Sequence, residues 1–394
     1  MRLAGGAMVL IVVIAATAFG LGGREQEPYA EAARIADSVR DFNDLQKRFQ
    51  DLSREKGAEY AFEILRRAEH PPNTDLHLLG HSIGEIMYEQ KGVAGIADCT
   101  QDFRNACSHS IVIGALNDFG ETALEMIRDS CRKAPGGSGA YTMCYHGLGH
   151  GVFAYFSYDL VATVDFCRKT GTSEYRNREY IECVGGAIME LMSGGGHDRD
   201  AWLRARERYL DPDRPLAPCM DAVIPKGAKI ICLTYLTPHL WELAGVQIGN
   251  PDPAIFPEAF AHCDVIPYSR QELRDACFGG FGKEFVVIAG GRDVRDVAAF
   301  SDDTFLKAIE WCGYAAADDG KRACVSDAVS SVFWGGENDP EAAFRFCGII
   351  ADTATQNACY ARLASAISTF TQGEERARLC ARIPEIHQKV CAEK

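Results

Sequence analysis

The sequence predicts an all-α protein built as an α-solenoid of about eight to nine helix-hairpin repeats. Three observations support this fold class. The sixteen cysteines fall into eight consecutive pairs, the first members of the pairs recur every 32 to 52 residues, and the flanking segments carry the apolar spacing of helices. This recurrence lies inside or near the range of about 20 to 50 residues that is typical of stacked supersecondary units.

Within a pair, the two cysteines are 8 to 16 residues apart. The first cysteine usually ends an apolar helical stretch, as in 123–127 before Cys131, and the second opens another, as in 359–367. We therefore expect eight sequential disulfides, each linking the end of one helix to the start of the next. The predicted pairs are Cys99 with Cys107, Cys131 with Cys144, Cys167 with Cys183, Cys219 with Cys232, Cys263 with Cys277, Cys312 with Cys324, Cys347 with Cys359, and Cys380 with Cys391.

The N-terminus predicts export. Arg2 is followed by residues 3–23, which carry no charge and would span about 31 Å as a helix, long enough for an uncleaved transmembrane anchor. The alternative is a signal peptide that is cleaved at the small residues 16–18, near Ala18. In both cases the rest of the chain faces the periplasm or the cell exterior, because the positive charges precede the apolar run. Disulfides persist in those compartments.

The chain divides into four predicted parts. Residues 1–23 are the membrane anchor or signal peptide, and residues 24–56 are a charged, cysteine-free helical stalk or linker. Residues 57–160 hold histidine-rich repeats, which start with a helix pair over 57–69 and 75–90 that lacks cysteines and caps the array. Residues 161–394 hold the remaining disulfide-stapled repeats, with loop insertions where the cysteine spacing is longest.

Over about residues 57–394 this pattern resembles the cysteine-stapled helical repeats of the Sel1-like and tetratricopeptide-like kind. The resemblance concerns architecture only, and it implies stacked helix hairpins. Because solenoids commonly present a long groove to another protein, we expect a protein or peptide partner in that groove. A metal-free interaction scaffold is therefore one candidate function.

Charge and composition exclude several classes of protein. Lysine and arginine number 41 against 55 aspartates and glutamates, which gives a net charge of −14. Such a chain repels phosphate backbones, so we expect no nucleic-acid partner. At 47% hydrophobic residues, the sequence is also unlike a disordered or collagen-like chain.

Five of the ten histidines occupy matching positions in three successive repeats. They are His77, His81, His109, His146 and His150. Three of them share one slot, two places after Asp75, Cys107 or Cys144, where Asp75 stands in the cysteine position of the first repeat. The other two lie four residues further along, which is one helical turn on the same face.

This pattern predicts a metal site, because histidines on helices about 8 to 10 Å apart can reach a single ion. Glu85, one turn beyond His81, is a further candidate ligand, or the base for a metal-activated water if the site is catalytic. A histidine and carboxylate set suits a divalent transition metal such as zinc, copper, iron or nickel. The alternatives are haem held non-covalently by two histidines and a structural role in capping or packing. The remaining histidines are expected at the surface or in loops: His70, His197, His239, His262 and His387.

Other motifs carry weaker signals. Residues 80–84 match the Gly-x-Ser-x-Gly nucleophile elbow of α/β-hydrolases, with Ser82 as nucleophile, but the preceding chain is patterned as a helix and not as a strand. Serine hydrolysis is therefore the weakest candidate function. The sequence contains no Cys-x-x-Cys, which excludes zinc ribbons, thioredoxin-like redox sites and c-type haem attachment. Residues 279–283 look phosphate-binding but lack the full motif, so we expect helix packing there.

Overall fold

The computed structural model describes residues 28–35, 41–71, 74–100, 102–134, 137–194, 198–293, 295–333 and 339–393. Over these ranges the chain is all-α, as predicted, with nineteen α-helices, α2 to α20, and no β-strand. A helical segment over 28–35 precedes them. The helices are α2 (Phe42–Lys56), α3 (Ala58–Arg67), α4 (Leu76–Lys91), α5 (Ala106–Phe119), α6 (Ala123–Cys131), α7 (Gly137–Tyr155), α8 (Leu160–Cys167), α9 (Arg178–Ser193), α10 (Arg199–Tyr209), α11 (Lys229–Tyr235), α12 (Thr237–Ala244), α13 (Phe256–Asp264), α14 (Gln271–Ala289), α15 (Asp302–Cys312), α16 (Asp318–Ala328), α17 (Pro340–Gly348), α18 (Thr353–Phe370), α19 (Gly373–Cys380) and α20 (Glu385–Ala392).

Short acidic side chains begin several of these helices. The Asp75 carboxylate accepts a hydrogen bond from the amide of Leu78 at 3.0 Å and caps α4, and Asp352 caps α18 in the same way. Such a cap satisfies an amide that has no carbonyl partner in the first turn of a helix. Asp75, which stands in the cysteine position of its repeat, thus begins α4 without a disulfide.

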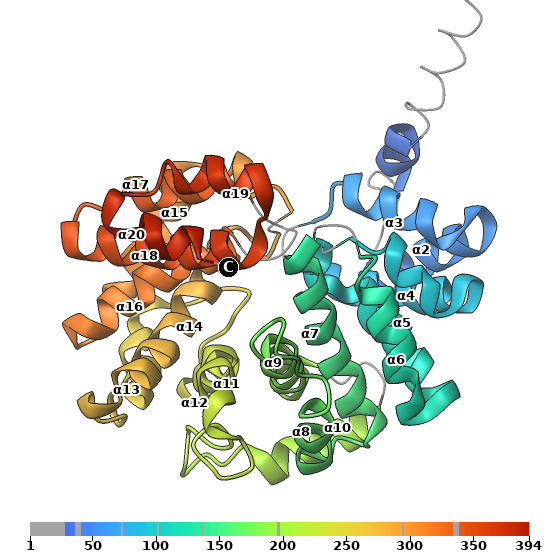
Figure 1. Ribbon diagram of the computed structural model, residues 1–394, viewed down its shortest axis with the longest axis horizontal. Coiled ribbons are helices and arrows are strands. Elements are labelled where there is room, and N and C mark those ends of the chain that lie inside the picture. Colours follow the sequence, from blue (N-terminus) through green and yellow to red (C-terminus); the bar gives the residue numbers. More distant parts are fainter. Residues whose placement is uncertain are drawn as a thin grey trace, which may run out of the picture.

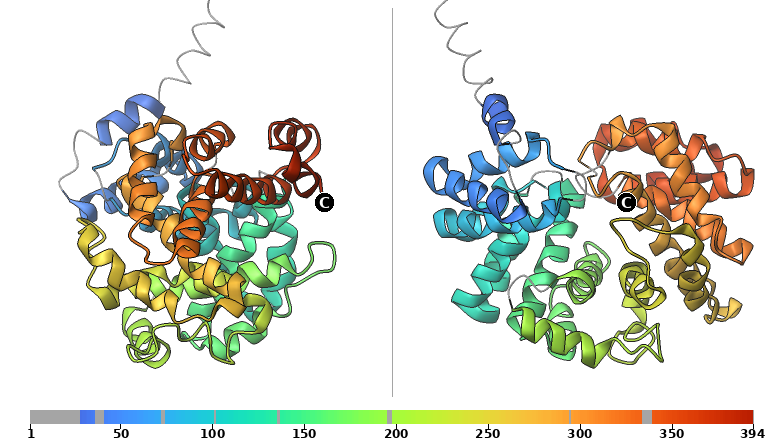
Figure 2. Two further views of the ribbon diagram at one scale, coloured as in Figure 1. Left: turned by 90° about the vertical axis from the view of Figure 1, so that its left-hand side faces the viewer. Right: turned by 180° about the vertical axis from the view of Figure 1, so that it is seen from behind.

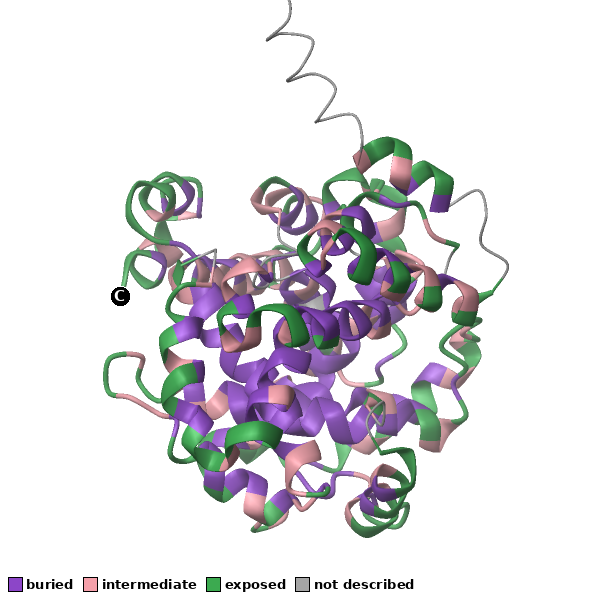
Figure 3. Ribbon diagram, turned by 90° about the vertical axis from the view of Figure 1, so that its right-hand side faces the viewer, coloured by how far each residue is buried: buried purple, intermediate pink, exposed green. Residues whose placement is uncertain are grey.

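The helices that carry the second cysteine of each pair form a continuous series. Helices α5, α7, α9, α11, α14, α16, α18 and α20 pack against one another in chain order, and α4 packs against α5 at the start of the series (Figure 1). Helices α6, α8, α13, α15, α17 and α19, which carry a first cysteine, each pack against the next member of this series. Figure 3 shows buried residues concentrated in the middle of the molecule and exposed residues on helices at its periphery.

All eight predicted disulfides are present. Their Cα atoms lie 5.4 to 5.7 Å apart, and no cysteine is free. The prediction of sequential, local disulfides between adjacent helices is therefore confirmed. The bonded pairs are Cys99 and Cys107, Cys131 and Cys144, Cys167 and Cys183, Cys219 and Cys232, Cys263 and Cys277, Cys312 and Cys324, Cys347 and Cys359, and Cys380 and Cys391.

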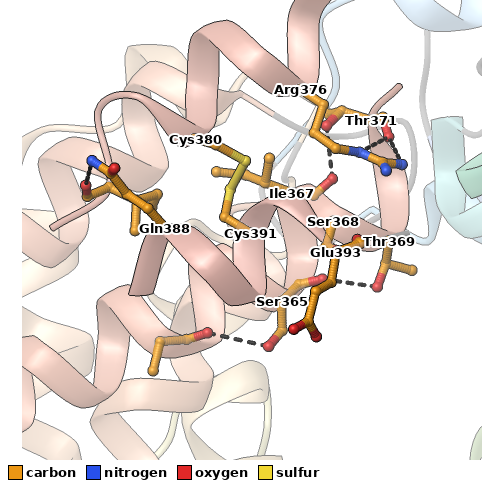
Figure 4. Close-up of a disulfide and its surroundings, with 12 residues drawn as sticks. Ser365, Ile367, Ser368, Thr369, Thr371, Arg376, Cys380, Gln388, Cys391 and Glu393 are labelled. Atoms are coloured by element: carbon orange, nitrogen blue, oxygen red, sulfur yellow. Dashed lines mark hydrogen bonds between the residues drawn. A yellow bond between two sulfur atoms is a disulfide. The ribbon is translucent and has the colours of Figure 1, made fainter. Parts of the chain in front are cut away.

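Figure 4 shows the last of these bridges. Cys380 and Cys391 join α19 to α20 beside Ile367 of α18. Both cysteines are buried, so the bridge forms part of the contact between this hairpin and α18.

The predicted solenoid is not confirmed, because segments far apart in the sequence also meet. Helix α7 packs against α18, and the Ser138 hydroxyl donates a hydrogen bond to the Thr369 carbonyl at 3.2 Å. The Arg295 guanidinium donates to the carbonyl of Ala68 at 2.7 Å. In an open solenoid each repeat contacts only its neighbours. Here the path of the helices curves so that its two ends face each other (Figures 1 and 2).

The predicted anchor or signal peptide, residues 1–23, lies outside the described residues. Among the helices that the structure describes, none is long and apolar enough to cross a membrane. Helix α2, in the predicted linker, packs against α3 and α4 and buries Leu45 and Phe49. The division of the chain into parts at residues 24, 57 and 161 stays a prediction.

We expect a non-reduced proteolytic digest, analysed by mass spectrometry, to contain Cys131 bonded to Cys144 and the seven counterparts of this bridge. The sulfur atoms of each pair are already joined in the fold, so blocking thiols before digestion should label no cysteine. Bridges that join different hairpins would contradict the arrangement described above.

Candidate metal centre

The five histidines of the predicted slot lie together in the first members of the helix series. His77 and His81, the α4 pair, project from α4, His109 projects from α5, and His146 and His150, the α7 pair, project from α7. Because α4, α5 and α7 pack in this order, α5 places His109 between the two pairs. We call these five residues the histidine cluster.

Glycines allow the three helices to approach closely. A Cβ atom at Gly147 would lie 2.5 Å from Cδ2 of His109, and one at Gly84 would lie 2.5 Å from the carbonyl oxygen of Cys107. Contacts this short do not occur for real side chains, so both positions require the absence of a Cβ. At Gly147 the group that packs this closely is the ring of His109.

The rings of the cluster are in mutual contact. The centroids of His77 and His81 are 4.6 Å apart, and the centroid of His109 lies 5.2 and 5.3 Å from them. On the other side, His109 stacks on His150 at 4.3 Å with an angle of 18° between the planes. One ligand nitrogen from each of His77, His109 and His150 falls within a group whose members are all within 4.8 Å of one another.

Hydrogen bonds fix the α4 pair in orientation. His77 Nδ1 donates to the carbonyl of Phe103 at 2.7 Å. Ser110 Oγ donates its proton to the carbonyl of His81, so it accepts from His81 Nδ1 at 3.0 Å. Both Nε2 atoms therefore carry the lone pair, and they face each other at 3.1 Å. Two nitrogens bound to one tetrahedral ion at about 2.0 to 2.1 Å lie about 3.3 Å apart, so this spacing fits shared coordination.

The α7 pair repeats this arrangement with carboxylates from α9. His150 Nδ1 donates to Glu190 at 3.0 Å, and the Nε2 atoms of His150 and His146 are 3.4 Å apart. His146 Nδ1 lies 3.7 Å from the carboxylate of Glu182, and His146 Nε2 lies 3.4 Å from the sulfur of Met189. Metal-bound histidines almost always donate their second N–H to an oxygen in this manner.

The electrostatics of the α7 pair follow from burial. Burial lowers the pKa of His146 from its ordinary value, although the Glu182 carboxylate opposes this effect. Burial also raises the pKa of Glu182, but His146 and Arg178 outweigh it and hold that pKa below its ordinary value. The site therefore keeps a buried carboxylate ionised between Arg178, at 3.2 Å, and the ring of His146.

His109 is the most unusual residue of the cluster. Its side chain is fully buried, and neither ring nitrogen has a hydrogen-bond partner among the described residues. Burial holds its pKa well below 6.5, and the neighbouring histidines, first of all His150, lower it further. The ring is therefore neutral near pH 7, the form that binds metals. A buried polar group without a partner costs about 1 to 3 kcal/mol, and a bound ion would remove that cost.

A cavity of 340 Å³ gives the cluster access from outside. Its lining includes His77, His81 and His150 of the cluster together with Glu85, Glu190 and Arg199. Glu85, a predicted ligand, is exposed on this lining and lies outside the group of three close ligand nitrogens. Small ions and water can reach the α4 pair through this opening.

Sequence reasoning missed the residues that α9 supplies, namely Glu182, Met189 and Glu190. A signal for one of them was present. Met189 lies six places after Cys183, the register position that His150 occupies after Cys144. The two glutamates follow no such register, and only the packing of α9 on α7 brings them to the histidines.

Four of the five histidines outside the slot are described, and none of them belongs to the histidine cluster. The fifth, His197, falls outside the described residues. The expectation of a surface or loop position is wrong for His239. This residue lies in α12 and is buried, and neither of its ring nitrogens has a partner in the part of the chain that the structure describes.

Ser82 does not form a nucleophile elbow. It lies in the middle of α4, and no strand precedes it in the described residues. Its hydroxyl donates to the carbonyl of Leu78 at 3.1 Å and accepts a hydrogen bond from Gln46 at 2.7 Å. An elbow needs a strained turn between a strand and a helix, so the geometry excludes this class of hydrolase site at Ser82.

Comparisons of this chain with models of protein families, with curated proteins and with solved structures find no match. The resemblance to cysteine-stapled helical repeats thus identifies no family. The chemistry of the histidine cluster is therefore the basis for a functional assignment.

We expect Gly147→Ala to lower the free energy of unfolding by up to about 2 kcal/mol. Helix propensity alone predicts a gain of about 1 kcal/mol for alanine at this position, but the new methyl group would collide with the His109 ring, and overpacking of this kind costs about 1 to 3 kcal/mol. Urea unfolding with a chelator present measures the difference. Gly227→Ala, which meets nothing within 4 Å, is the matched control, and stabilisation at both positions would contradict the close packing.

We expect His239→Ala to weaken the pH dependence of stability of the metal-free protein. Burial lowers the pKa of His239 to about 4, whereas histidine in an unfolded chain titrates near 6.5. Below pH 6.5 the unfolded state therefore gains a proton that the folded state lacks. Stability is lost as the pH falls from 6.5 toward 4, by up to about 1.4 kcal/mol per pH unit. Unfolding curves at pH 7, 6 and 5 test this, and an unchanged slope would show that His239 is accessible to protons in the folded state.

Proposed function

We propose that this chain is an exported, membrane-anchored helical repeat protein that binds a divalent transition-metal ion through its histidine cluster. His77, His109 and His150 are the first ligands in this proposal, and His81 and His146 complete the set. The observation that carries it is His109, which is fully buried between two histidine pairs with no hydrogen-bond partner in the described chain for either ring nitrogen.

The donor set defines the class of ion. Neutral imidazoles suit zinc, copper, iron and nickel better than magnesium or calcium. Phe103 and Glu190 accept hydrogen bonds from the second nitrogens of His77 and His150, which orients those rings for coordination. An ion fits this cluster better than haem does, because the five rings contact one another and leave no planar slot between them.

The cysteines support the compartment that we propose. All sixteen are paired, and disulfides persist in the periplasm and outside the cell but are rare in reducing compartments. The uncharged run 3–23 then serves as the membrane anchor, with cleavage near Ala18 as the alternative.

A second candidate function is a metal-free scaffold that binds a protein or peptide. A cavity of 780 Å³ where α7 and α9 meet α18 and α19 supports it, because Arg176, Arg178 and Arg376 line this cavity beside several hydroxyl groups. Such a lining suits an acidic segment of a partner. In this proposal the histidine cluster only holds the first repeats in register.

We expect His109→Ala to lower the affinity for zinc by at least about 100-fold, because it removes a ligand, and even the loss of a residue behind a ligand costs about 10- to 100-fold. Competition titration with a chromophoric chelator measures the affinity, and circular dichroism checks that the helices remain. His239→Ala is the matched control, since it removes another buried histidine without partners, outside the cluster. Equal zinc affinity for wild type and His109→Ala would move the assignment to the scaffold.

A further inference from the structure

We propose that the α7 pair and the thioether of Met189 form a copper(I) site on the side of the histidine cluster that faces α9. His146 and His150 supply two nitrogens, and Met189 supplies the sulfur. This inference goes beyond the proposed function, because it adds a ligand from α9 and a monovalent ion. The cluster holds one ion at a time, either copper(I) on this side or a divalent ion.

The first step concerns the register of the repeats. Met189 lies six places after Cys183, as His150 does after Cys144. Helices α7 and α9 pack against each other, so these equivalent positions lie on neighbouring helices. The row of candidate ligands on α4 and α7 thus continues into α9, with a soft sulfur atom in place of an imidazole.

The second step concerns the protons of the two rings. His150 Nδ1 donates to Glu190 at 3.0 Å, so its Nε2 carries a lone pair. The ionised carboxylate of Glu182 lies 3.7 Å from His146 Nδ1, which places the proton of that neutral ring on Nδ1. The thioether of Met189 has no proton to donate. The two Nε2 atoms and the sulfur are therefore three lone-pair atoms, and no hydrogen bond can join one to another.

The third step concerns distances. Zinc bonds of about 2.0 to 2.1 Å to nitrogen and about 2.3 Å to sulfur, taken as a guide for copper, place the donor atoms of a tetrahedral site about 3.3 to 3.6 Å apart. The Nε2 atoms of His146 and His150 are 3.4 Å apart, and His146 Nε2 lies 3.4 Å from the sulfur of Met189. The rings of the α7 pair meet at 62°, so their planes intersect, as shared coordination of one ion requires.

The fourth step concerns charge. The carboxylates of Glu182 and Glu190 are 1% and 4% exposed and bring two negative charges beside the α7 pair. Arg178 pairs with Glu182 at 3.2 Å and offsets one of them. Lys283, whose charge also reaches the α7 pair, is itself paired with Glu284. With both histidines neutral, one buried negative charge remains, and a single monovalent cation compensates it.

The fifth step concerns the choice of ion. A thioether is a soft ligand that selects copper(I), whereas magnesium and calcium prefer oxygen. All sixteen cysteines are bonded in disulfides, so thioethers are the sulfur ligands that remain for an ion. Met189 lines both the cavity of 340 Å³ and a neighbouring cavity of 140 Å³, so an ion that enters either one meets this side chain. The ion enters as copper(I), so the site needs no reductant.

Copper(I) and zinc are the two probes that test this proposal. The full-length chain in detergent is stripped with a chelator and titrated without oxygen with each ion in competition with a chromophoric chelator. We expect Met189→Leu to lower the copper(I) affinity by at least about 10-fold, because a lost ligand costs at least as much as a lost residue behind one. The zinc affinity should stay unchanged. Met87→Leu, the matched control, alters a buried methionine that packs against Gly95, and it should leave both affinities unchanged.

X-ray absorption at the copper edge gives a second readout. The copper(I) spectrum of the wild type should contain a sulfur scatterer beside nitrogen, and Met189→Leu should lose the sulfur. Met189→His places in α9 the residue that the matching position of α7 carries. This variant should show nitrogen in place of sulfur and bind zinc more tightly than the wild type does.

The contrary outcomes separate this inference from the proposed function. Equal copper(I) affinity for wild type and Met189→Leu, or a wild-type spectrum without sulfur, would overturn the copper(I) site. Equal losses of copper(I) and zinc affinity in Met189→Leu would assign the side chain to packing and overturn the site as well. A wild type that binds zinc but not copper(I) would overturn this inference and leave the proposed function standing. Binding of neither ion would overturn both.

Discussion

The short disulfide cross-link between the two segments of each hairpin constrains the rest of this structure. Each disulfide holds two Cα atoms 5.4 to 5.7 Å apart, so the second helix of every hairpin is fixed to the preceding segment at the position of its cysteine. Residues two places after the second cysteine then occupy equivalent positions in successive helices. His109 and His146 occupy this position in α5 and α7, and the N-cap Asp75 places His77 equivalently in α4. The histidine cluster is a consequence of this shared register.

Packing then decides what the cluster can do. Gly84 and Gly147 remove the side chains that would hold α4, α5 and α7 apart, and five imidazoles fill the space between these helices. Burial keeps His109 neutral, and the oxygens of Phe103 and Glu190 orient the rings on either side of it. Apolar side chains would fill the same space with less cost in desolvation. The placement of lone pairs at coordination spacing therefore favours a ligand role for these residues over a packing role.

Local patterns in the sequence predicted the local features of the fold. The spacing of Cys131 and Cys144 and their apolar flanks predicted both a disulfide and two helices, because a loop of this length brings the ends of adjacent helices together. The repeated slot predicted that His77, His109 and His146 lie on neighbouring helices, since stacked repeats place equivalent residues side by side. The fold does not test whether these residues and Glu85 bind a metal, so metal ligation stays a prediction. Features that depend on contacts between distant segments were not predicted.

The packing of α7 against α18 joins residues more than 200 positions apart, and no periodicity along the chain encodes it. The same reason applies to Glu182 and Glu190, which reach the α7 pair from the next repeat. His239 was expected at the surface because it stands alone in the sequence, but the packing of α12 buries it. The cysteine register could have revealed Met189, because it shares the position of His150. The most direct measurement of the central claim is anomalous diffraction from crystals of the zinc-loaded protein, recorded on both sides of the zinc absorption edge. This account predicts anomalous density between α4, α5 and α7, within bonding distance, about 2.0 to 2.1 Å, of a ring nitrogen of His109. Density only at surface carboxylates, or no density near His109 at full zinc loading, would contradict the claim that this buried cluster is a metal centre.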